Sequence, residues 1–334
     1  MTRFRRCLDI IRTAAVITAL VVLTVSGTGC RPGPDVAGDD GASPEPITVG
    51  LLPIVDSLPF FVADRNGYFT EAGVEVDLQV YQSALLRDTA LQSGEIDGMV
   101  GDILAALALK DSGTDVRIVS ICLGATPDEG RFAILAAPDS GIETVDDLRG
   151  VEIALSPNTI IEYVVDRLLT SHGFAPEEIR DLVVTKIPDR FQMLMSGQIQ
   201  AACLPDPLAA FAEHQGARLV LDDTGDLNVS QSVIIFTGSA IAHNPEGISR
   251  LLEAYSRAVE AINADPDAFR ELMVEMARLP EPIKDTYPVD HFPSPQVPTK
   301  GQVEAVIEWM EAKDLLGTSL TYEDIVTDEF AAGR

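Results

Sequence analysis

Short β-rich runs alternate with helical stretches through most of this chain, and this alternation restricts its fold more than any other feature. The runs are rich in Val, Ile and Leu and are bounded by Gly, Pro, Asp and Ser. Strands joined by helical crossovers predict an α/β fold with mostly parallel sheets that helices cover on both faces. The predicted strands are residues 47–54, 74–81, 97–101, 116–123, 132–137, 151–156, 182–187, 201–204, 217–222 and 231–237.

The last hundred residues are mostly helical in pattern. Asn244 and Pro245 form a cap followed by proline at the first helical position, and apolar residues then recur at helical spacing as far as Ile262. Residues 279–299 hold six Pro, which predicts an extended crossing segment. A further helix is predicted over 300–314, and no internal repeat is visible in the sequence.

The first residues form a separate segment of a different kind. Basic residues between Arg3 and Arg12 precede an apolar run of 13 residues, and the sequence SGTGC then ends at Cys30. This order is typical of a bacterial lipoprotein signal, in which residues 1–29 are removed and the Cys30 thiol is acylated. Gly27 stands where such signals usually have Leu, so simple cleavage and secretion is the alternative.

Residues 30–46 follow the signal and join it to the predicted strands. They are rich in Pro, Gly, Asp and Ser, and Val36 is their only large apolar residue. Such a segment cannot bury a core, so we expect a disordered tether that reaches at most roughly 50–60 Å. With a lipid at one end, the folded part is expected at the outer face of the cytoplasmic membrane, on its periplasmic or extracellular side.

The balance of charge excludes two classes of partner. The chain has 52 acidic and 24 basic side chains and a formal charge of −28. Binding to nucleic acid and adsorption to anionic lipid headgroups both need a basic surface, so neither is expected. The four Cys and four His form no CxxC or HxxxH pair, which argues against a metal site, and no cofactor is expected.

The motifs of common enzymes are missing from the sequence. It contains no GxSxG, GxxxxGK[ST] or HExxH, and no GxGxxG follows a predicted strand. Cys122 and Cys203 lie in apolar runs and are interpreted as buried small side chains, neither a disulfide nor a nucleophile. We therefore expect a binding protein and not an enzyme.

Polar residues stand directly beside the ends of the apolar strands. In open parallel sheets, ligands bind beyond the carboxyl ends of the strands, where loops and helix N-termini converge. This rule selects a set of candidate ligand-binding residues from six separate loops. They are Asp56, Ser57, Ser83, Arg87, Gly101, Asp102, Arg131, Ser156, Asn158, Thr159, Ile160, Glu162 and Asp206.

Two of these loops leave a plainer interpretation open. Thr159 and Glu162 have the spacing of a capping box, so the backbone N–H groups there can bind a negative ligand atom or simply begin a helix. Asp206 in the sequence LPDP either contacts the ligand or caps the helix that follows.

Four segments together resemble a known family. They are ITVGLLPIVDSLPFFVADRNGYFTEAG at 47–73, LQSGEIDGMVGD at 91–102, GIETVDDLRGVEIAL at 141–155 and MSGQIQAACLPDP at 195–207. Their order and spacing resemble the ABC-importer solute-binding proteins for nitrate, sulfonates, taurine and thiamine pyrimidines. The resemblance implies a two-lobed periplasmic-binding-protein fold of type II, with a small-molecule ligand between the lobes. It also implies a monomer that delivers its ligand to an ABC permease and its ATPase.

The resemblance divides the chain into two lobes. Residues 47–137 together with 235–334 are expected to form lobe 1, and residues 138–234 are expected to form lobe 2. The chain then crosses between the lobes twice, near 136–140 and near 231–237, and the two crossings act as the hinge.

The class of ligand follows from the charges in the candidate set. Four carboxylates, on Asp56, Asp102, Glu162 and Asp206, favour a thiamine-precursor aminopyrimidine or a related heterocycle, because a carboxylate can accept from its ring N–H and its amino group. Sulfonate, taurine or nitrate is the next choice and would use arginines. The arginines that could serve are Arg87 and Arg131 of the set, together with Arg190.

Three alternatives remain open. Leu58, Phe60, Phe61 or Tyr163 either form a wall against a ligand ring or belong to the core. The protein could be an enzyme on the same fold, similar to dehydratases or to a pyrimidine synthase. It could also be a receptor lobe that senses a ligand without transport.

The signal segment leads to a direct prediction about Cys30. Metabolic labelling with a fatty acid should mark the wild-type protein in a bacterial host and leave Cys30→Ser unlabelled, because only the thiol of Cys30 accepts the lipid. Equal labelling of the two proteins would contradict the lipoprotein interpretation.

Overall fold

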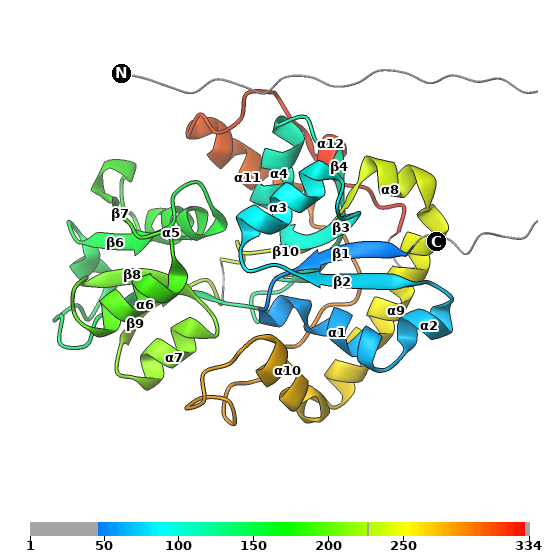
Figure 1. Cartoon of the computed structure of the whole chain (residues 1–334). Coiled ribbons are helices and arrows are strands. Elements are labelled where there is room, and N and C mark those ends of the chain that lie inside the picture. The colour runs from blue at the N-terminus through cyan, green and yellow to red at the C-terminus, as the bar shows by residue number, and fades with distance from the viewer. Residues whose placement is uncertain (1–45, 226, 331–334) are drawn as a thin grey trace, which may run out of the picture. The chain divides into compact units, whose positions relative to one another are not determined.

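The computed structural model describes residues 46–225 and 227–330. The predicted signal peptide, the lipidated Cys30 and the tether up to residue 45 lie outside the described residues. The described chain folds around two five-stranded sheets, each flanked by helices (Figure 1).

The first sheet is built mainly from the early part of the chain. Its strand order is β2-β1-β3-β10-β4. Strand β1 pairs in parallel with β2 and β3, whereas β10 pairs antiparallel with both β3 and β4. The strands are β1 (Ile47–Leu51), β2 (Val76–Val80), β3 (Gly98–Asp102), β4 (Val116–Leu123) and β10 (Ser232–Thr237).

The second sheet repeats this arrangement in the order β7-β6-β8-β5-β9. Strand β6 pairs in parallel with β7 and β8, and β5 pairs antiparallel with β8 and β9. The sheets are therefore mixed, with one reversed strand in each. The strands are β5 (Phe132–Ala136), β6 (Glu152–Leu155), β7 (Arg180–Val183), β8 (Ala201–Pro205) and β9 (Arg218–Asp222).

The sheets correct one predicted lobe boundary. Residues 132–137 were assigned to lobe 1, but β5 is hydrogen-bonded between β8 and β9 in the second sheet. The chain therefore leaves the first sheet after Leu123 and returns to it at Ser232. The two connections are residues 124–131 and 223–231. The early boundary was misplaced because an apolar strand carries no mark of the sheet that it joins.

The strand predicted at 182–187 is also displaced. The structure ends β7 at Val183 and begins helix α6 at Ile187. Pro188 lies in the first turn of α6, where the missing N–H of proline costs no helical hydrogen bond. The apolar run was correctly recognised, but its second half belongs to the approach to this helix.

Helices connect and cover the strands. Short 3-10 turns are Val55–Ser57, Val145–Leu148, Pro176–Glu178 and Pro266–Phe269. The helices of the first half are α1 (Leu58–Arg65), α2 (Tyr68–Ala72), α3 (Ala84–Ser93), α4 (Ile103–Asp111), α5 (Ile160–Ser171) and α6 (Ile187–Met195). The later ones are α7 (Leu208–His214), α8 (Gly238–His243), α9 (Pro245–Ala264), α10 (Arg270–Met276), α11 (Lys300–Ala312) and α12 (Tyr322–Ile325).

Helix α9 confirms the capping pattern that the sequence predicted. The Asn244 side chain accepts a hydrogen bond from the Gly247 N–H at 2.9 Å, and Pro245 begins the helix. Its apolar face is buried against α1 and α2, which lie beside it in Figure 1. Within the described residues, no helix has the length and apolar character needed to cross a membrane.

The proline-rich segment 279–299 contains no helix or strand, as expected. Hydrogen bonds at Phe292 and Gln296 hold its second half. The Asn263 side chain bonds Phe292 in both directions, at 2.7 and 3.0 Å, and Gln296 O accepts from the Ile121 N–H at 2.7 Å. This part of the segment is therefore tied to α9 through Asn263 and to β4 through Ile121.

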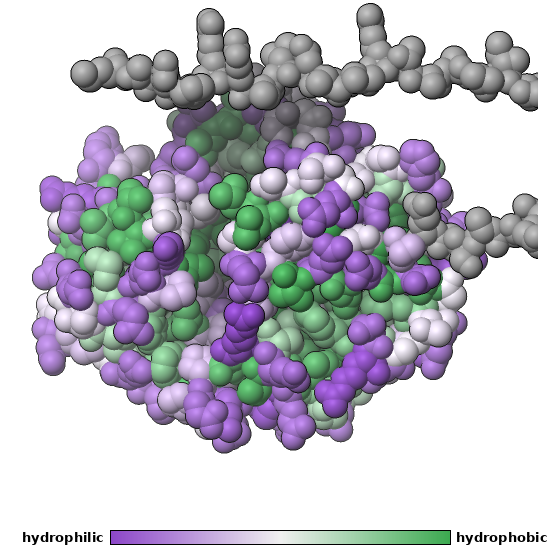
Figure 2. Space-filling view, in the orientation of Figure 1, coloured by the Kyte–Doolittle hydropathy of each residue, from purple (hydrophilic) through white to green (hydrophobic). Residues whose placement is uncertain are grey.

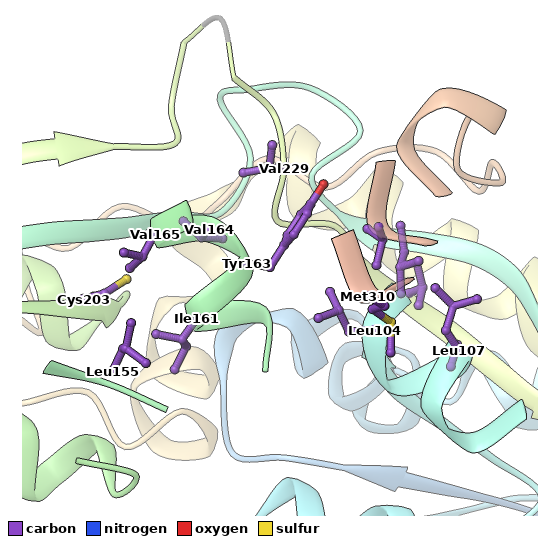
Figure 3. Close-up of a cluster of buried hydrophobic side chains, with 14 of the residues drawn as sticks. Leu104, Leu107, Leu155, Ile161, Tyr163, Val164, Val165, Cys203, Val229 and Met310 are labelled. Atoms are coloured by element: carbon purple, nitrogen blue, oxygen red, sulfur yellow. The ribbon is translucent and has the colours of Figure 1, made fainter. Parts of the chain in front are cut away.

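The surface and the interior differ as expected for a globular chain. Figure 2 shows hydrophilic side chains spread over the visible face, with apolar patches between them. Inside, one buried cluster contains residues from both sheets and from α4, α5 and α11 (Figure 3). The apolar interior is therefore continuous from one sheet to the other.

The close approach of β3 and β10 predicts the effect of a small substitution. A Cβ atom on Gly98 would lie 2.5 Å from the Phe236 ring and 2.8 Å from Ile235 O. Gly98→Ala should therefore lower the free energy of unfolding by about 1–3 kcal/mol, measured by urea titration.

Gly301 in α11 is the matched control, because no atom lies within 4 Å of the Cβ position there. Gly301→Ala should raise the free energy of unfolding by about 0.5–1 kcal/mol, since alanine restricts the unfolded chain more than glycine. Equal destabilisation of the two variants would contradict the tight packing at Gly98.

Candidate ligand-binding site

Two carboxylates stand at the ends of strands in the first sheet. Asp102 caps α4 and accepts a hydrogen bond from the Ala105 N–H at 2.8 Å. Asp56 lies in the turn before α1, where the Ser232 hydroxyl bonds to it. Burial raises the pKa of both carboxyl groups, and hydrogen bonds and the positive charge of Arg87 partly oppose this rise.

Arg87 is the buried cation beside these two acids, and its side chain is only 4% exposed. Its guanidinium donates to Val100 O at 2.6 Å and to the Asp88 carboxylate at 2.7 and 2.9 Å. A Cβ on Gly101 would lie 3.5 Å from Arg87 Nη2, so the glycine leaves room for the guanidinium at the end of β3. The predicted Arg87, Gly101 and Asp102 therefore lie close together.

Two predicted serines have structural partners. The Ser57 hydroxyl is buried and donates to Leu52 O at 2.9 Å. The Ser83 hydroxyl caps α3 by accepting from the Leu86 N–H at 3.3 Å. These contacts account for both side chains without a ligand.

In the second sheet, Arg131 is surrounded by three acids. It lies 2.8 Å from Asp222, 2.9 Å from Glu213 and 3.7 Å from Asp206. The Asp206 carboxylate also accepts from the Ala210 N–H at 3.0 Å in the first turn of α7. Burial raises the pKa of Asp206, and Arg131 opposes the rise. Asp206 therefore caps the first turn of α7 and also lies beside the Arg131 charge.

The loop after β6 differs in detail from the predicted capping box. Thr159 caps α5 and accepts from the Ile161 N–H at 3.2 Å, and Ile160 is the first helical residue. The Glu162 carboxylate accepts at 2.5 Å from the N–H of Asn158 and not from that of Thr159. Asn158 has φ 59°, in the left-handed region, so the chain turns sharply just before the helix.

Glu162 is also occupied by a partner from the far end of the chain. Its side chain is 6% exposed, and its other oxygen lies 2.5 Å from Lys313 Nζ. A carboxylate held by a lysine and a backbone N–H has little capacity left for a ligand. Its expected contact with ligand is therefore replaced by a structural role at the beginning of α5.

Arg190 is the most deeply buried charge near this loop. Its Nη1 donates to Ser156 Oγ at 3.2 Å and to Val184 O at 3.1 Å. Its Nε and Nη2 have no hydrogen-bond partner among the described residues. Burial lowers the pKa of this guanidinium. A buried cation without a carboxylate partner is costly, so this feature requires an explanation.

The structure adds residues that the strand-end rule did not select. Asp290 and Tyr287 lie on the proline-rich segment, and Glu129 lies on the first connection between the sheets. Burial raises the pKa of Asp290 to about 7, and the nearby charges of Asp206, Asp56 and Glu129 add to the rise. Tyr287 is 4% exposed and bonds to Asp206.

Asp290 and Tyr287 connect the two sheets electrostatically. Burial raises the pKa of the Tyr287 hydroxyl, and the charges of Asp290, Asp206 and Asp56 act in the same direction. Asp56 follows β1 of the first sheet and Asp206 follows β8 of the second, so acids from both sheets converge on this segment. We call Asp56, Asp206, Asp290, Glu129 and Tyr287 the acidic cluster. No pattern in the sequence pointed to the last three, because none of them stands directly after a predicted strand.

The proposed aromatic wall is mostly core. Leu58 and Phe60 have no exposed surface, and the Phe60 ring centroid lies 5.0 Å from that of Tyr255. Tyr163 is 2% exposed and its ring meets the Trp309 ring edge-on at 5.4 Å. Only Phe61 among the four candidates is partly exposed.

Neither cysteine of the folded part is placed for nucleophilic chemistry. Cys122 and Cys203 are free thiols and both are buried, as predicted. Burial raises the pKa of Cys203 to about 12, which keeps it as the thiol. In the part of the chain that the structure describes, no group of three His, Cys, Asp or Glu is arranged to hold a metal ion.

Two surface hollows lie away from the acidic cluster. One lies between the end of α5 and β9 and is lined by Leu168, His172 and Leu221. The other is lined by Ile47, Asp97 and Ala240. Neither contains a residue predicted to bind ligand, so the acidic cluster and not a hollow is the candidate site.

Comparison with known proteins assigns the class. The family model described as NMT1/THI5 like matches residues 55–269, and the chain belongs to this family. A putative ABC transporter periplasmic binding protein of Brachyspira hyodysenteriae is 25% identical over 281 residues, which cover 78% of this chain and 78% of that protein.

Two further comparisons extend this result. A putative aliphatic sulfonates-binding protein of Escherichia coli is 28% identical over 219 residues, covering 65% of this chain and 67% of that protein. The crystal structure of the periplasmic aliphatic sulphonate binding protein SsuA from Escherichia coli matches with a TM-score of 0.73 at 21% identity, over 85% of this chain and 92% of that one. The two mixed sheets therefore form the periplasmic-binding-protein fold.

The raised pKa of Asp290 predicts how stability changes with pH. A carboxyl group that binds its proton more tightly in the folded state makes folding less favourable as pH rises from its ordinary value toward 7. Asp223, whose pKa burial raises to about 6, acts in the same direction. The wild type should therefore lose stability between about pH 4 and pH 7.

Asp290→Asn should remove most of this loss, because the amide carries no charge to bury. We expect its gain over the wild type to be on the order of 1–3 kcal/mol at pH 8 and close to zero at pH 4, measured by urea unfolding at each pH. A gain of the same size at both values would show that Asp290 does not titrate in this range.

Proposed function

We propose that this protein is the solute-binding component of an ABC importer. It captures a small polar molecule between two lobes and delivers it to a membrane permease driven by an ATPase. The family assignment, the fold and the name of the Brachyspira relative support this role. The two sheets with their helices are the proposed lobes, and residues 124–131 and 223–231 are the proposed hinge.

The convergence of Asp56 and Asp206 is the observation that carries the proposal. They come from different sheets, and both act on Asp290 and Tyr287. Several carboxylates that face one another away from water are unfavourable, and a ligand that neutralises them would relieve this cost. Such a ligand stabilises the arrangement in which the two sheets are close, which is the physical basis of closure around a solute.

The charges of the acidic cluster favour a ligand rich in hydrogen-bond donors. Its two nearby arginines are already engaged, Arg87 by Asp88 and Arg131 by Glu213 and Asp222. A protonated aminopyrimidine of the thiamine-precursor type, or a related small heterocycle, would donate its ring N–H and amino group to one carboxylate. The Tyr287 hydroxyl and Asp290, which is half protonated near neutral pH, would bind the remaining polar atoms.

A sulfonate, including taurine, is the second candidate. Arg190 donates to Ser156 in the loop that leads into α5, and two of its guanidinium nitrogens have no partner among the described residues. A cation beside a helix N-terminus favours an anion. The Escherichia coli relative is named as a sulfonate-binding protein. Against this candidate, the acidic cluster would repel an anion that approached from the side of Asp206.

The remaining parts of the proposal concern location and assembly. Acylation of Cys30 would hold a monomer at the outer face of the cytoplasmic membrane, where a permease could receive the ligand. Both relatives are named as binding proteins, which supports binding without turnover. The Brachyspira relative is named as part of an ABC transporter, which supports transport over sensing.

Removal of the negative charge of Asp206 tests the proposal. The native ligand is first identified by mass spectrometry of the small molecule that copurifies, and its affinity is then measured by calorimetry. Asp206→Asn keeps an oxygen that can accept from the Ala210 N–H but removes the negative charge. Affinity should fall by about ten- to hundredfold, the cost of about 1.5–3 kcal/mol for a hydrogen bond to a charged group.

Glu213→Gln is the matched control, because Glu213 pairs with the same Arg131 but is not among the charges that act on Asp290. It should bind the ligand as the wild type does. Higher affinity of Asp206→Asn for a sulfonate would replace the first candidate ligand by the second. Turnover of the copurified molecule would overturn the binding function itself.

A further inference from the structure

Helices α5 and α11 meet through a compact group of polar contacts, although they flank different sheets. Lys313, at the end of α11, lies 2.5 Å from Glu162 and 2.8 Å from Asp166, both on α5. The Trp309 indole N–H donates to Asp166 at 2.8 Å, and the Trp309 ring meets Tyr163 edge-on. We call these five residues the α5–α11 clamp.

The clamp borders the apolar interior that joins the two sheets. Helix α11 packs on α4 of the first sheet, whereas α5 follows β6 of the second. Figure 3 shows Tyr163 lying between two groups of buried side chains. One group is Ile161, Val164 and Val165, and the other is Leu104, Leu107 and Met310.

Lys313 balances two like charges that stand one turn apart. Glu162 and Asp166 are four residues apart on one helix face, and their side chains are only 6% and 14% exposed. Like charges at this spacing destabilise a helix, and partial burial increases the repulsion. The Lys313 ammonium contacts both carboxylates. Their repulsion is therefore balanced only while the end of α11 lies against α5.

The Glu162 side chain connects the clamp to the loop after β6. Glu162 accepts from Lys313 with one carboxylate oxygen and from the Asn158 N–H with the other, each at 2.5 Å. Asn158 and Thr159 form the turn that exposes the first N–H groups of α5. The position of this turn therefore depends on the contact with α11.

We propose that Lys313 and Trp309 are positioning residues that hold the beginning of α5 in its ligand-binding arrangement and favour the closed state of the two lobes. The inference rests on the two-lobe division of the proposed function but does not depend on the identity of the ligand. A contact made only in the closed state raises its population, and apparent affinity falls in proportion when that population falls.

The chain provides its own reporter, because Trp309 is its single tryptophan. Acrylamide quenching of Trp309 fluorescence measures how far the clamp is open, and small-angle scattering measures the separation of the lobes. Both are applied to the ligand-free protein. Lys313→Met should increase quenching and the radius of gyration, because Glu162 and Asp166 then repel each other without a counter-charge.

Three variants make the comparison specific. Lys300→Met is the control, because Lys300 is on the same helix but pairs with Glu304 and Glu323 at the surface. It should behave as the wild type does. Lys313→Arg should restore the wild-type signal, and Asp166→Asn, which keeps an acceptor for the Trp309 N–H, should open the clamp less than Lys313→Met.

A second arm measures affinity for 4-aminopyrimidine as the probe. If the probe binds, Lys313→Met should lose about tenfold or more in affinity, while Lys300→Met should lose none. Quenching and radius of gyration that are equal in the wild type and Lys313→Met would overturn the inference. Failure of the wild type to bind the probe would count against the proposed ligand alone, since the ligand-free measurements test the clamp independently.

Discussion

Strand β10 fills the gap between β3 and β4, and the first sheet depends on it. Without β10, strand β4 would have no strand beside it in the sheet, since its other backbone pairing is an isolated bridge from Ile118 to Val326. Strand β5 fills the same position between β8 and β9 in the second sheet. Each of these strands is the first one that the chain forms after it crosses from one sheet to the other. The connections 124–131 and 223–231 therefore each lead into a strand that is paired on both sides.

The cost of burying acidic side chains is the second constraint on the folded chain. The chain has an excess of acidic side chains, and several of them, which follow strands of both sheets, act on Asp290. Most are compensated locally: Arg131 holds three acids, and Lys313 holds two. Asp290 and Asp223 are exceptions, since one carboxylate oxygen of each has no hydrogen-bond partner among the described residues, and burial raises their pKa values to about 7 and about 6. Polar groups that a fold leaves unsatisfied mark the places where function competes with stability.

The patterns in the sequence predicted the elements well and their partners poorly. Every predicted strand has a counterpart, and the cap at Asn244 is made as expected, because both features depend on residues close together in the chain. The sheet that contains β5 depends on hydrogen bonds to residues about 70–90 positions away, which no local pattern records. The repeated strand order was likewise invisible, because it is a repeat of topology and not of sequence.

The candidate site shows the same limit. The strand-end rule selected Asp56, Arg87, Asp102 and Asp206, which the structure places beside buried charges. It also selected Ser57, Ser83 and Glu162, whose partners are structural. Asp290 and Tyr287 were missed because their segment has neither a strand nor a helix. Lys313 could not be connected with Glu162, since 151 residues separate them.

The order of strands along the chain also has a consequence for the way the protein reaches its native state. All strands of the second sheet come from one continuous stretch, Phe132 to Asp222, so that sheet can be completed as soon as this stretch is available. The first sheet begins earlier in the chain but must wait for residues 232–237. During synthesis or export from the N-terminus, the second sheet therefore has all of its strands before the first sheet does. In the first sheet, β3 keeps an unpaired edge until β10 is available. At this edge the nascent chain is most exposed to incorrect pairing.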